Sequence, residues 1–181
     1  QIGIQVLTDE VEFVNQSFYL IGRIDRYNAI VSKKDRTSMK DLMGQVNLEY
    51  PVILVDHQPV ELKRAKELGV DGLVFGCLNP DGSVDMENMA LLMEAAGDTP
   101  VTFHRAFDHT ADPFKALEDI ISLGCTRILT SGCKPTALEG AALLAELVEK
   151  AGERIIIMPG CGVREDNIAE IARLSGAREF H

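Results

Sequence analysis

The chain has 181 residues, of which 46% are hydrophobic, so a single globular domain with a sizeable core is expected. Asp and Glu outnumber Lys and Arg by 28 to 18, which gives a net charge of −10. This charge argues against nucleic-acid and membrane-surface binding, because both need clustered basic residues. No apolar run approaches the roughly 20 residues of a membrane span, and no secretory signal is recognisable. We therefore expect a cytoplasmic protein with reduced cysteines.

Residues 1–50 differ in style from the rest of the chain. The stretch IGIQVLTDEVEFVNQSFYLIGR predicts a β-hairpin, because two β-rich runs flank a polar turn near Asn15 and Gln16. Residues 23–36 are polar and typical of a loop. The stretch TSMKDLMGQV predicts a short helix that is capped by Thr37 or Ser38.

From residue 51 the chain alternates between strands and helices. The strand segments are apolar throughout, which is typical of parallel strands that are buried on both faces. Gly69 ends the first helix, and Asp112 with Pro113 predicts the N-cap and first turn of another. The expected strands cover residues 51–57, 70–76, 100–107, 126–132 and 154–160, with a weaker one at 177–181. The expected helices cover residues 60–69, 85–97, 112–124, 135–152 and 163–176.

Repeated βα units predict an α/β fold with a mostly parallel sheet flanked by helices and an N-terminal β-hairpin. A closed barrel of eight βα units needs about 250 residues, more than this chain has. We therefore expect an open sheet, a partial TIM-like barrel, or a barrel completed by a second chain. Open sheet edges invite association, so a homodimer is also expected.

The first candidate site lies in the segment FHRAFD, at the C-terminal end of a predicted parallel strand. Ligands of α/β proteins bind at this end of the sheet. His104 offers a general acid or base, and Arg105 can hold an anion with two hydrogen bonds. The alternative is that Arg105 and Asp108 form a structural ion pair.

Two more strand ends carry TSG (residues 130–132) and PGCGV (residues 159–163). Glycines let the backbone approach a ligand, and successive N–H groups can hold a phosphate. Ser131, Gly132, Gly160 and Gly162 are therefore candidate anion-binding residues. The alternative is that these are tight turns, in which glycine supplies a positive φ.

The sequence gives weaker support for a metal site than for an anion site. Cys77, Cys133 and Cys161 each follow a predicted strand, and thiolates suit Cu(I) or Zn, but they come from separate loops. Cys125 is interpreted as structural. His57, beside Asp56 at another strand end, lacks further local ligands and is interpreted as an exposed or hydrogen-bonded histidine. No metal or cofactor is therefore predicted.

Residues 70–181 contain the segments GLVFG, DG.VD, PVTFHRAFD, RILTSG, ALEG, IIIMPGCGV and EFH. Through these segments this part of the chain resembles the copper homeostasis protein CutC family, whose fold is a TIM-type barrel. It implies that FHRAFD is the family's polar centre. The family's N-terminal segment with its ELC-like motif and RPRGGDF-like loop is absent, which removes the cysteines usually associated with copper.

Residues 1–76 resemble the C-terminal part of calcineurin-like metallophosphoesterases, through VLTDEVEFVN..FYLIGR.DR and PVILVDHQP. That resemblance makes His57 a metal ligand, but the family's other metal motifs are missing. The segment 60–76 fits both families. We therefore predict one chimeric α/β domain, with a metallophosphoesterase-like part at 1–59, a shared crossover at 60–76 and a CutC-like part at 77–181.

The functional hypothesis that follows is an engineered fold chimera that is not an enzyme, because the sites of both parents are incomplete. The alternative is a CutC-like binding module for copper or a small anion at the C-terminal ends of the strands. An active metallophosphoesterase is nearly excluded by the number of metal ligands.

Overall fold

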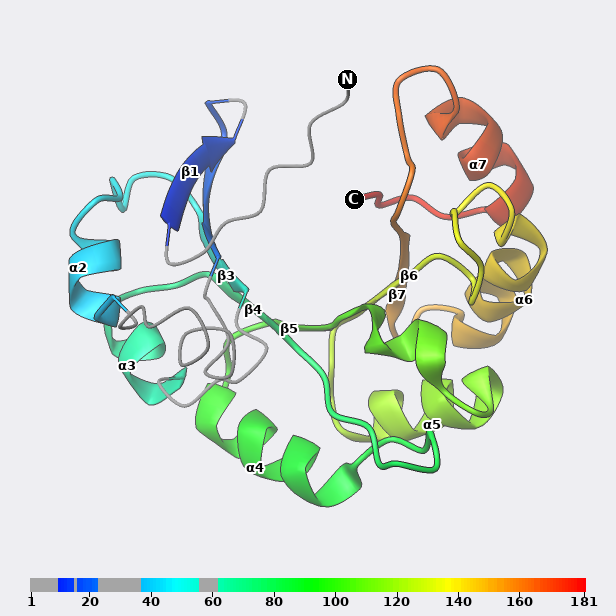
Figure 1. Cartoon of the computed structure of the whole chain (residues 1–181), viewed down its shortest axis with the longest axis horizontal. Coiled ribbons are helices and arrows are strands. Elements are labelled where there is room, and N and C mark those ends of the chain that lie inside the picture. The colour runs from blue at the N-terminus through cyan, green and yellow to red at the C-terminus, as the bar shows by residue number, and fades with distance from the viewer. Residues whose placement is uncertain (1–9, 15, 23–36, 56–61) are drawn as a thin grey trace. The chain divides into compact units, whose positions relative to one another are not determined.

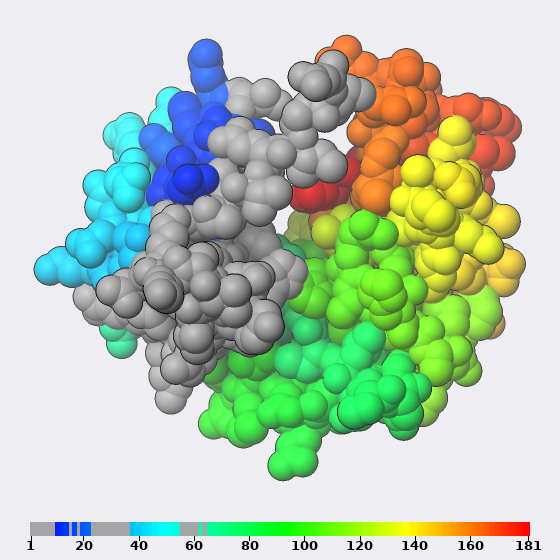
Figure 2. Space-filling model, viewed as in Figure 1, coloured from blue at the N-terminus to red at the C-terminus, as the bar shows by residue number. Residues whose placement is uncertain are grey.

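The computed structural model describes residues 10–14, 16–22, 37–55 and 62–181; the other residues are grey in Figures 1 and 2. The chain forms two compact units. Unit 1 comprises residues 1–75 with 94–100, and unit 2 comprises residues 76–93 with 101–181. His57 and its neighbour Asp56 lie outside the described residues, so the interpretation of His57 stays a prediction.

Unit 1 begins with the predicted hairpin. Strands β1 (Glu10–Val14) and β2 (Phe18–Gly22) are antiparallel, and Gln16 in the turn has a φ of 56°. Strand β2 then pairs in parallel with β3 (Val52–Val55), which pairs in parallel with β4 (Gly72–Phe75). The unit also contains the helices α2 (Met39–Met43) and α3 (Leu62–Glu67). The side chain of Ser38 caps α2 by accepting a hydrogen bond from the N–H of Asp41, as expected.

The pairing of β3 with β4 is reinforced by Asp71, directly before β4. Its carboxylate accepts a hydrogen bond of 2.8 Å from the N–H of Val52. Its own N–H donates to the carbonyl of Val52, also at 2.8 Å. Asp71 therefore extends the ladder between the two strands by a pair of bonds to one residue.

Unit 2 holds three parallel strands in chain order, each followed by helical structure (Figure 1). In its core, Phe103, Ile128 and Ile157 of the strands are buried, as are Leu117 and Leu144 of the helices. Burial on both faces explains the continuous apolar sequence of β5 and β6. In β7 burial alternates instead, with Ile156 exposed and Ile157 buried. The elements are β5 (Val101–Phe103), the 3₁₀ helix η1 (Arg105–His109), α5 (Pro113–Ser122), β6 (Arg127–Thr130), α6 (Ala141–Ala151), β7 (Ile156–Pro159) and α7 (Ile168–Ser175), and α4 (Met86–Ala96) contributes residues to both units.

Helix α5 of unit 2 begins where the sequence predicts. Asp112 is the N-cap of α5 and accepts hydrogen bonds from the N–H groups of Phe114 and Lys115, with Pro113 in the first turn. This cap satisfies two N–H groups that the helix itself cannot, and it was predicted from the Asp-Pro pair.

Residues 177–181 do not form the weaker strand that the sequence predicts. One backbone bond, from the N–H of His181 to the carbonyl of Pro159, links this segment to β7. An ion pair of 2.6 Å between Glu179 and Arg127 holds it to the start of β6. The segment lies beside the sheet without the repeated backbone pairing of a strand.

The predicted fold class is confirmed: the protein has an α/β fold with mostly parallel strands, flanking helices and an N-terminal hairpin. None of the helices among the described residues is long and apolar enough to cross a membrane.

Candidate functional site

The predicted residues of the FHRAFD segment lie where β5 ends. His104 caps the 3₁₀ helix η1, because its Nδ1 accepts a hydrogen bond of 3.2 Å from the N–H of Ala106. The helix turns the chain back and directs Asp108 toward the end of the neighbouring strand β6. A short helical turn therefore converts a local sequence motif into contacts between residues more than twenty positions apart.

Asp108 is the centre of these contacts. Its Oδ1 accepts hydrogen bonds from the hydroxyl of Thr130 at 2.5 Å, from the N–H of Ser131 at 3.0 Å and from the N–H of Cys133 at 3.1 Å. Its Oδ2 lies 2.8 Å from Nε of Arg105. Only 5% of the Asp108 side chain is exposed. A buried carboxylate with this many donors is held firmly in place.

The same contacts set the charge of Asp108. Burial alone would raise the pKa of its carboxyl, but the hydrogen bonds from Thr130, Arg105, Cys133 and Ser131 outweigh that effect and hold the pKa below its usual value. Asp108 is therefore ionised at neutral pH.

Arg105 is fixed along one edge of its guanidinium. Nε is paired with Asp108, and Nη2 donates a hydrogen bond of 3.1 Å to Oγ of Ser131. Nη1 has no protein partner within the described ranges, and 42% of the side chain is exposed. The ion pair that the sequence offered as an alternative is thus formed, and it leaves the edge made by Nη1 and Nη2 available.

Ser131 and Gly132 serve the packing of the loop after β6. The hydroxyl of Ser131 donates to the carbonyl of Lys134 at 2.5 Å, and Ser131 is fully buried. Gly132 has a φ of +69°, and a Cβ at this position would lie 2.4 Å from the carbonyl oxygen of Gly140. Glycine is required here by the close approach of two backbone segments.

The loop after β7 keeps its backbone donors available. The N–H of Gly160 donates to the carbonyl of Thr130 at 2.9 Å, which ties the loop to β6. Asn167 donates to the carbonyl of Gly162 at 2.8 Å. In the part of the chain that the structure describes, the N–H groups of Cys161, Gly162 and Val163 have no acceptor.

Thr130 also contacts Asp108, and the sequence analysis did not identify it as a site residue. Besides donating to Asp108, its hydroxyl accepts a hydrogen bond of 2.9 Å from the N–H of Gly132. A threonine inside an apolar strand resembles any β-branched core residue. The available signal was its place as the last residue of a strand, where its hydroxyl can reach the next loop.

Within the described parts of the chain, the cysteines are not grouped with other His, Cys, Asp or Glu side chains that could hold a metal ion. Burial and the nearby Asp85 raise the pKa of Cys77, and burial and Asp108 raise that of Cys133. Sγ of Cys161 lies 3.1 Å from the carbonyl oxygen of Pro135. Among the described residues, no three His, Cys, Asp or Glu side chains come together in a group that could hold a metal ion.

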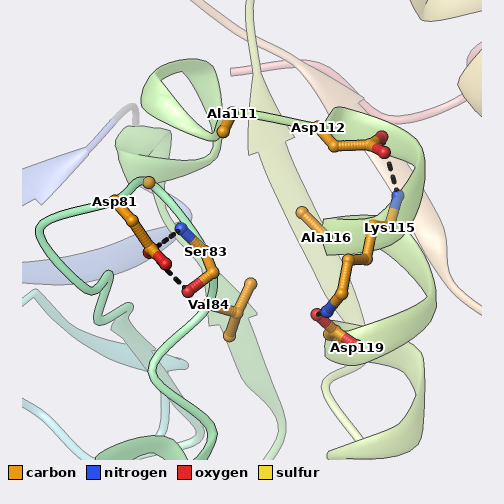
Figure 3. A pocket seen from close by; sticks show the side chains of 9 residues that line it. Asp81, Ser83, Val84, Ala111, Asp112, Lys115, Ala116 and Asp119 are labelled. Carbon is orange, nitrogen blue, oxygen red and sulfur yellow. Dashed lines mark hydrogen bonds and ion pairs between the residues drawn. The ribbon is translucent and has the colours of Figure 1, made fainter.

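A shallow pocket of about 140 Å³ lies between the loop after β4 and the start of α5 (Figure 3). Its polar groups are already engaged with one another. Asp81 accepts from the N–H and hydroxyl of Ser83, Asp112 caps α5, and Asp119 is paired with Lys115. At the ends of the strands, by contrast, Nη1 and Nη2 of Arg105 keep N–H groups that can donate to a ligand.

Comparisons with known proteins place the chain in one family. The family model described as the CutC family matches residues 53–181. A CutC family protein of Parabacteroides distasonis is 49% identical over 160 residues, which cover 88% of this chain and 65% of the relative. A CutC family protein of Xanthomonas campestris is 53% identical over 121 residues, which cover 67% of this chain and 50% of the relative. The chain thus spans about half to two thirds of the length of these relatives.

A solved structure shows the same fold. The crystal structure of a protein named as copper homeostasis protein CutC, from Streptococcus agalactiae, matches with a TM-score of 0.75. The match covers 97% of this chain and 95% of the other, at 24% sequence identity.

These findings correct the predicted chimera. A relative that matches 88% of the chain necessarily includes the supposed crossover at residues 60–76, and the family model includes it as well. The predictions of an engineered or de novo chimera and of a metallophosphoesterase-like part are therefore wrong. The comparisons do not support the resemblance of residues 1–59 to the metallophosphoesterases, and the chain belongs to the CutC family.

Proposed function

We propose that this chain is a binding module for a small anion, held at the C-terminal ends of strands β5, β6 and β7. The observation that carries the proposal is the state of Arg105. Asp108 and Ser131 fix its guanidinium along one edge, while the edge formed by Nη1 and Nη2 stays available on a side chain that is 42% exposed. A guanidinium that is already positioned loses little freedom when it binds an anion.

The loop after β7 supports the same proposal. Its N–H groups at Cys161, Gly162 and Val163 have no acceptor within the described chain, and the loop follows a parallel strand. Backbone N–H groups at this end of a parallel sheet are common anion ligands. The predicted role of Gly160 and Gly162 therefore becomes one of shaping a loop that offers backbone donors.

We further propose that the module is not an enzyme. Asp108 is ionised at neutral pH, and its oxygens already accept hydrogen bonds from four groups. A general base needs a pKa near the working pH and a free lone pair. Asp108 has neither, so its role is to position Arg105.

Copper is the second candidate ligand, because the CutC protein of S. agalactiae is named for copper homeostasis. Among the described residues, no three His, Cys, Asp or Glu side chains are grouped so that they could form a copper site. A copper site of that kind would have to take at least one ligand from outside the described residues. The anion is therefore the ligand that the observed geometry favours.

The location and assembly of the protein remain proposals as well. Four cysteines without disulfide partners suit the reducing cytoplasm. A homodimer stays a prediction that sedimentation analysis can test.

The test is a titration of the ¹⁵N-labelled protein with a panel of small anions, followed by NMR chemical shifts. We expect at least one anion to bind with a Kd below about 1 mM, and Arg105→Gln to weaken that binding by about tenfold or more. Arg154→Gln is the matched control, because Arg154 is also paired with a carboxylate and is 47% exposed. Equal binding by the wild type and Arg105→Gln, or no saturable binding, would refute the proposal.

A further inference from the structure

We propose that the ligand of the strand-end site is a planar monocarboxylate, held end-on by Nη1 and Nη2 of Arg105, and that Asp108 selects against doubly charged anions. This inference rests on the proposed function and narrows its ligand class. It follows from the shape of the available donor edge and from the charge that stands behind it.

The donor edge has the shape of a carboxylate acceptor. Asp108 at Nε and Ser131 at Nη2 occupy the side of the guanidinium that faces the sheet. What remains is the end-on fork, in which one N–H of Nη1 and one of Nη2 point in parallel within a plane. Two parallel donors match the two oxygens of one carboxylate and satisfy both. A phosphate can also place two oxygens on this fork, but its remaining oxygens then need donors from elsewhere.

The charge behind the fork limits the ligand to a weak anion. Asp108 is ionised and buried, so the pair that it forms with Arg105 has no net charge. The Asp108 carboxylate repels a ligand across the width of one guanidinium and offsets a large part of the attraction from Arg105. The cost of removing an ion from water rises with the square of its charge, so a dianion has the larger cost to offset.

Three other groups near Asp108 bear on this balance, namely Lys134, Cys133 and His104. Lys134 is exposed, and its charge acts on Cys133 in opposition to Asp108. Cys133 itself is neutral at ordinary pH, because burial and Asp108 raise its pKa. His104 uses Nδ1 to cap η1. Within the described ranges, Arg105 is the fixed cation and Asp108 the buried anion that are paired at the site, in a chain of net charge −10.

The experiment compares three probes on the wild-type protein at one pH of about 8, where a phosphate monoester with a second pKa of about 6 is a dianion. Acetate is planar with one negative charge, dimethyl phosphate is tetrahedral with one, and methyl phosphate is tetrahedral with two. Holding the pH constant leaves the ionisation of the protein unchanged. We expect acetate to bind about tenfold more tightly than methyl phosphate, with dimethyl phosphate between them.

The variant Asp108→Asn tests the role of the buried charge. We expect it to narrow the difference between acetate and methyl phosphate to less than about threefold, because the repulsion is gone. Asp166→Asn is the control, since it removes the same charge from a residue that is 73% exposed. Thermal unfolding of both variants verifies that they are folded.

The outcomes separate this inference from the proposed function. Methyl phosphate or dimethyl phosphate binding as tightly as acetate to the wild type would overturn the inference and leave an anion site in place. Failure of all three probes to bind would refute the proposed function itself. The wild-type comparison decides the ligand class even if Asp108→Asn does not fold.

Discussion

The loops that follow β6 and β7 have similar residues and the same backbone twist, yet they use their N–H groups differently. Two consecutive residues are left-handed in each: Gly132 and Cys133 in the first, Cys161 and Gly162 in the second. In the loop after β6, the N–H groups point to Asp108 and to the hydroxyl of Thr130. In the loop after β7, three successive N–H groups have no acceptor within the described chain.

The difference comes from a carboxylate on another strand end. Asp108 reaches across from the turn after β5 and takes up the donors of the loop after β6. No described carboxylate does the same for Cys161, Gly162 and Val163. The N–H groups of the loop after β6 are therefore occupied by an acceptor from the protein itself, and those of the loop after β7 are not occupied by any described residue.

The largest expected effect follows from removing that internal anion. Asp108→Ala leaves the donors of Thr130, Ser131 and Cys133 without an acceptor in a buried site, so we expect a loss of about 3–5 kcal/mol in the free energy of unfolding. Urea denaturation measures it. Asp166→Ala, on the exposed side of the loop after β7, is expected to cost less than about 0.5 kcal/mol. Similar losses for the two variants would mean that Asp108 does not organise the loop.

Glycine substitutions in the two loops should differ as well. Gly132→Ala combines a φ of +69° with a Cβ only 2.4 Å from a backbone carbonyl oxygen, so we expect a cost of about 2–4 kcal/mol. Gly162→Ala has a φ of +75°, but its nearest contact is the side chain of Thr136 at 3.3 Å. We expect about 1 kcal/mol for this change. Thermal or urea unfolding of both variants gives the comparison, and equal costs would contradict the tight packing after β6.

The smallest expected effect is a dependence on pH. The pKa of Asp108 is lower in the folded protein than in the unfolded chain, so its contribution is fully present above the unfolded pKa of about 4 and is lost as the pH falls through the folded pKa. The stability difference between the wild type and Asp108→Asn should therefore be constant from about pH 6 to pH 5 and shrink below about pH 4. Urea unfolding at several pH values tests this, and a difference that grows in acid would reverse the sign.

Much of the fold could be predicted from the sequence, because continuous apolar strands and capped helices are local signals. The Asp112-Pro113 cap and the hairpin around Gln16 are examples, and both are confirmed. The chimera was a wrong prediction for the same reason. Short patterns such as PVILVDHQP are local too, and only a match across the crossover segment reveals the family.

The sequence was enough to predict which residues lie at the candidate site, but not which hydrogen bonds and contacts they make. The sequence indicates that His104, Arg105, Asp108 and Ser131 lie at strand ends, and the structure joins three of them through Asp108. The sequence alone could not show that Gly132 is required by the close approach of Gly140, because that contact depends on the path of the loop after β6. Whether these residues bind a ligand stays a prediction.

Asp71 has a consequence for errors during folding. A shift of β4 by one residue against β3 would turn the buried side chains of Leu73 and Phe75 to the opposite face of the sheet. The same shift would break both hydrogen bonds between Asp71 and Val52, because one residue must meet both backbone groups of the other. The two hydrogen bonds of Asp71, directly before β4, therefore favour the native register of β4 over a register shifted by one residue.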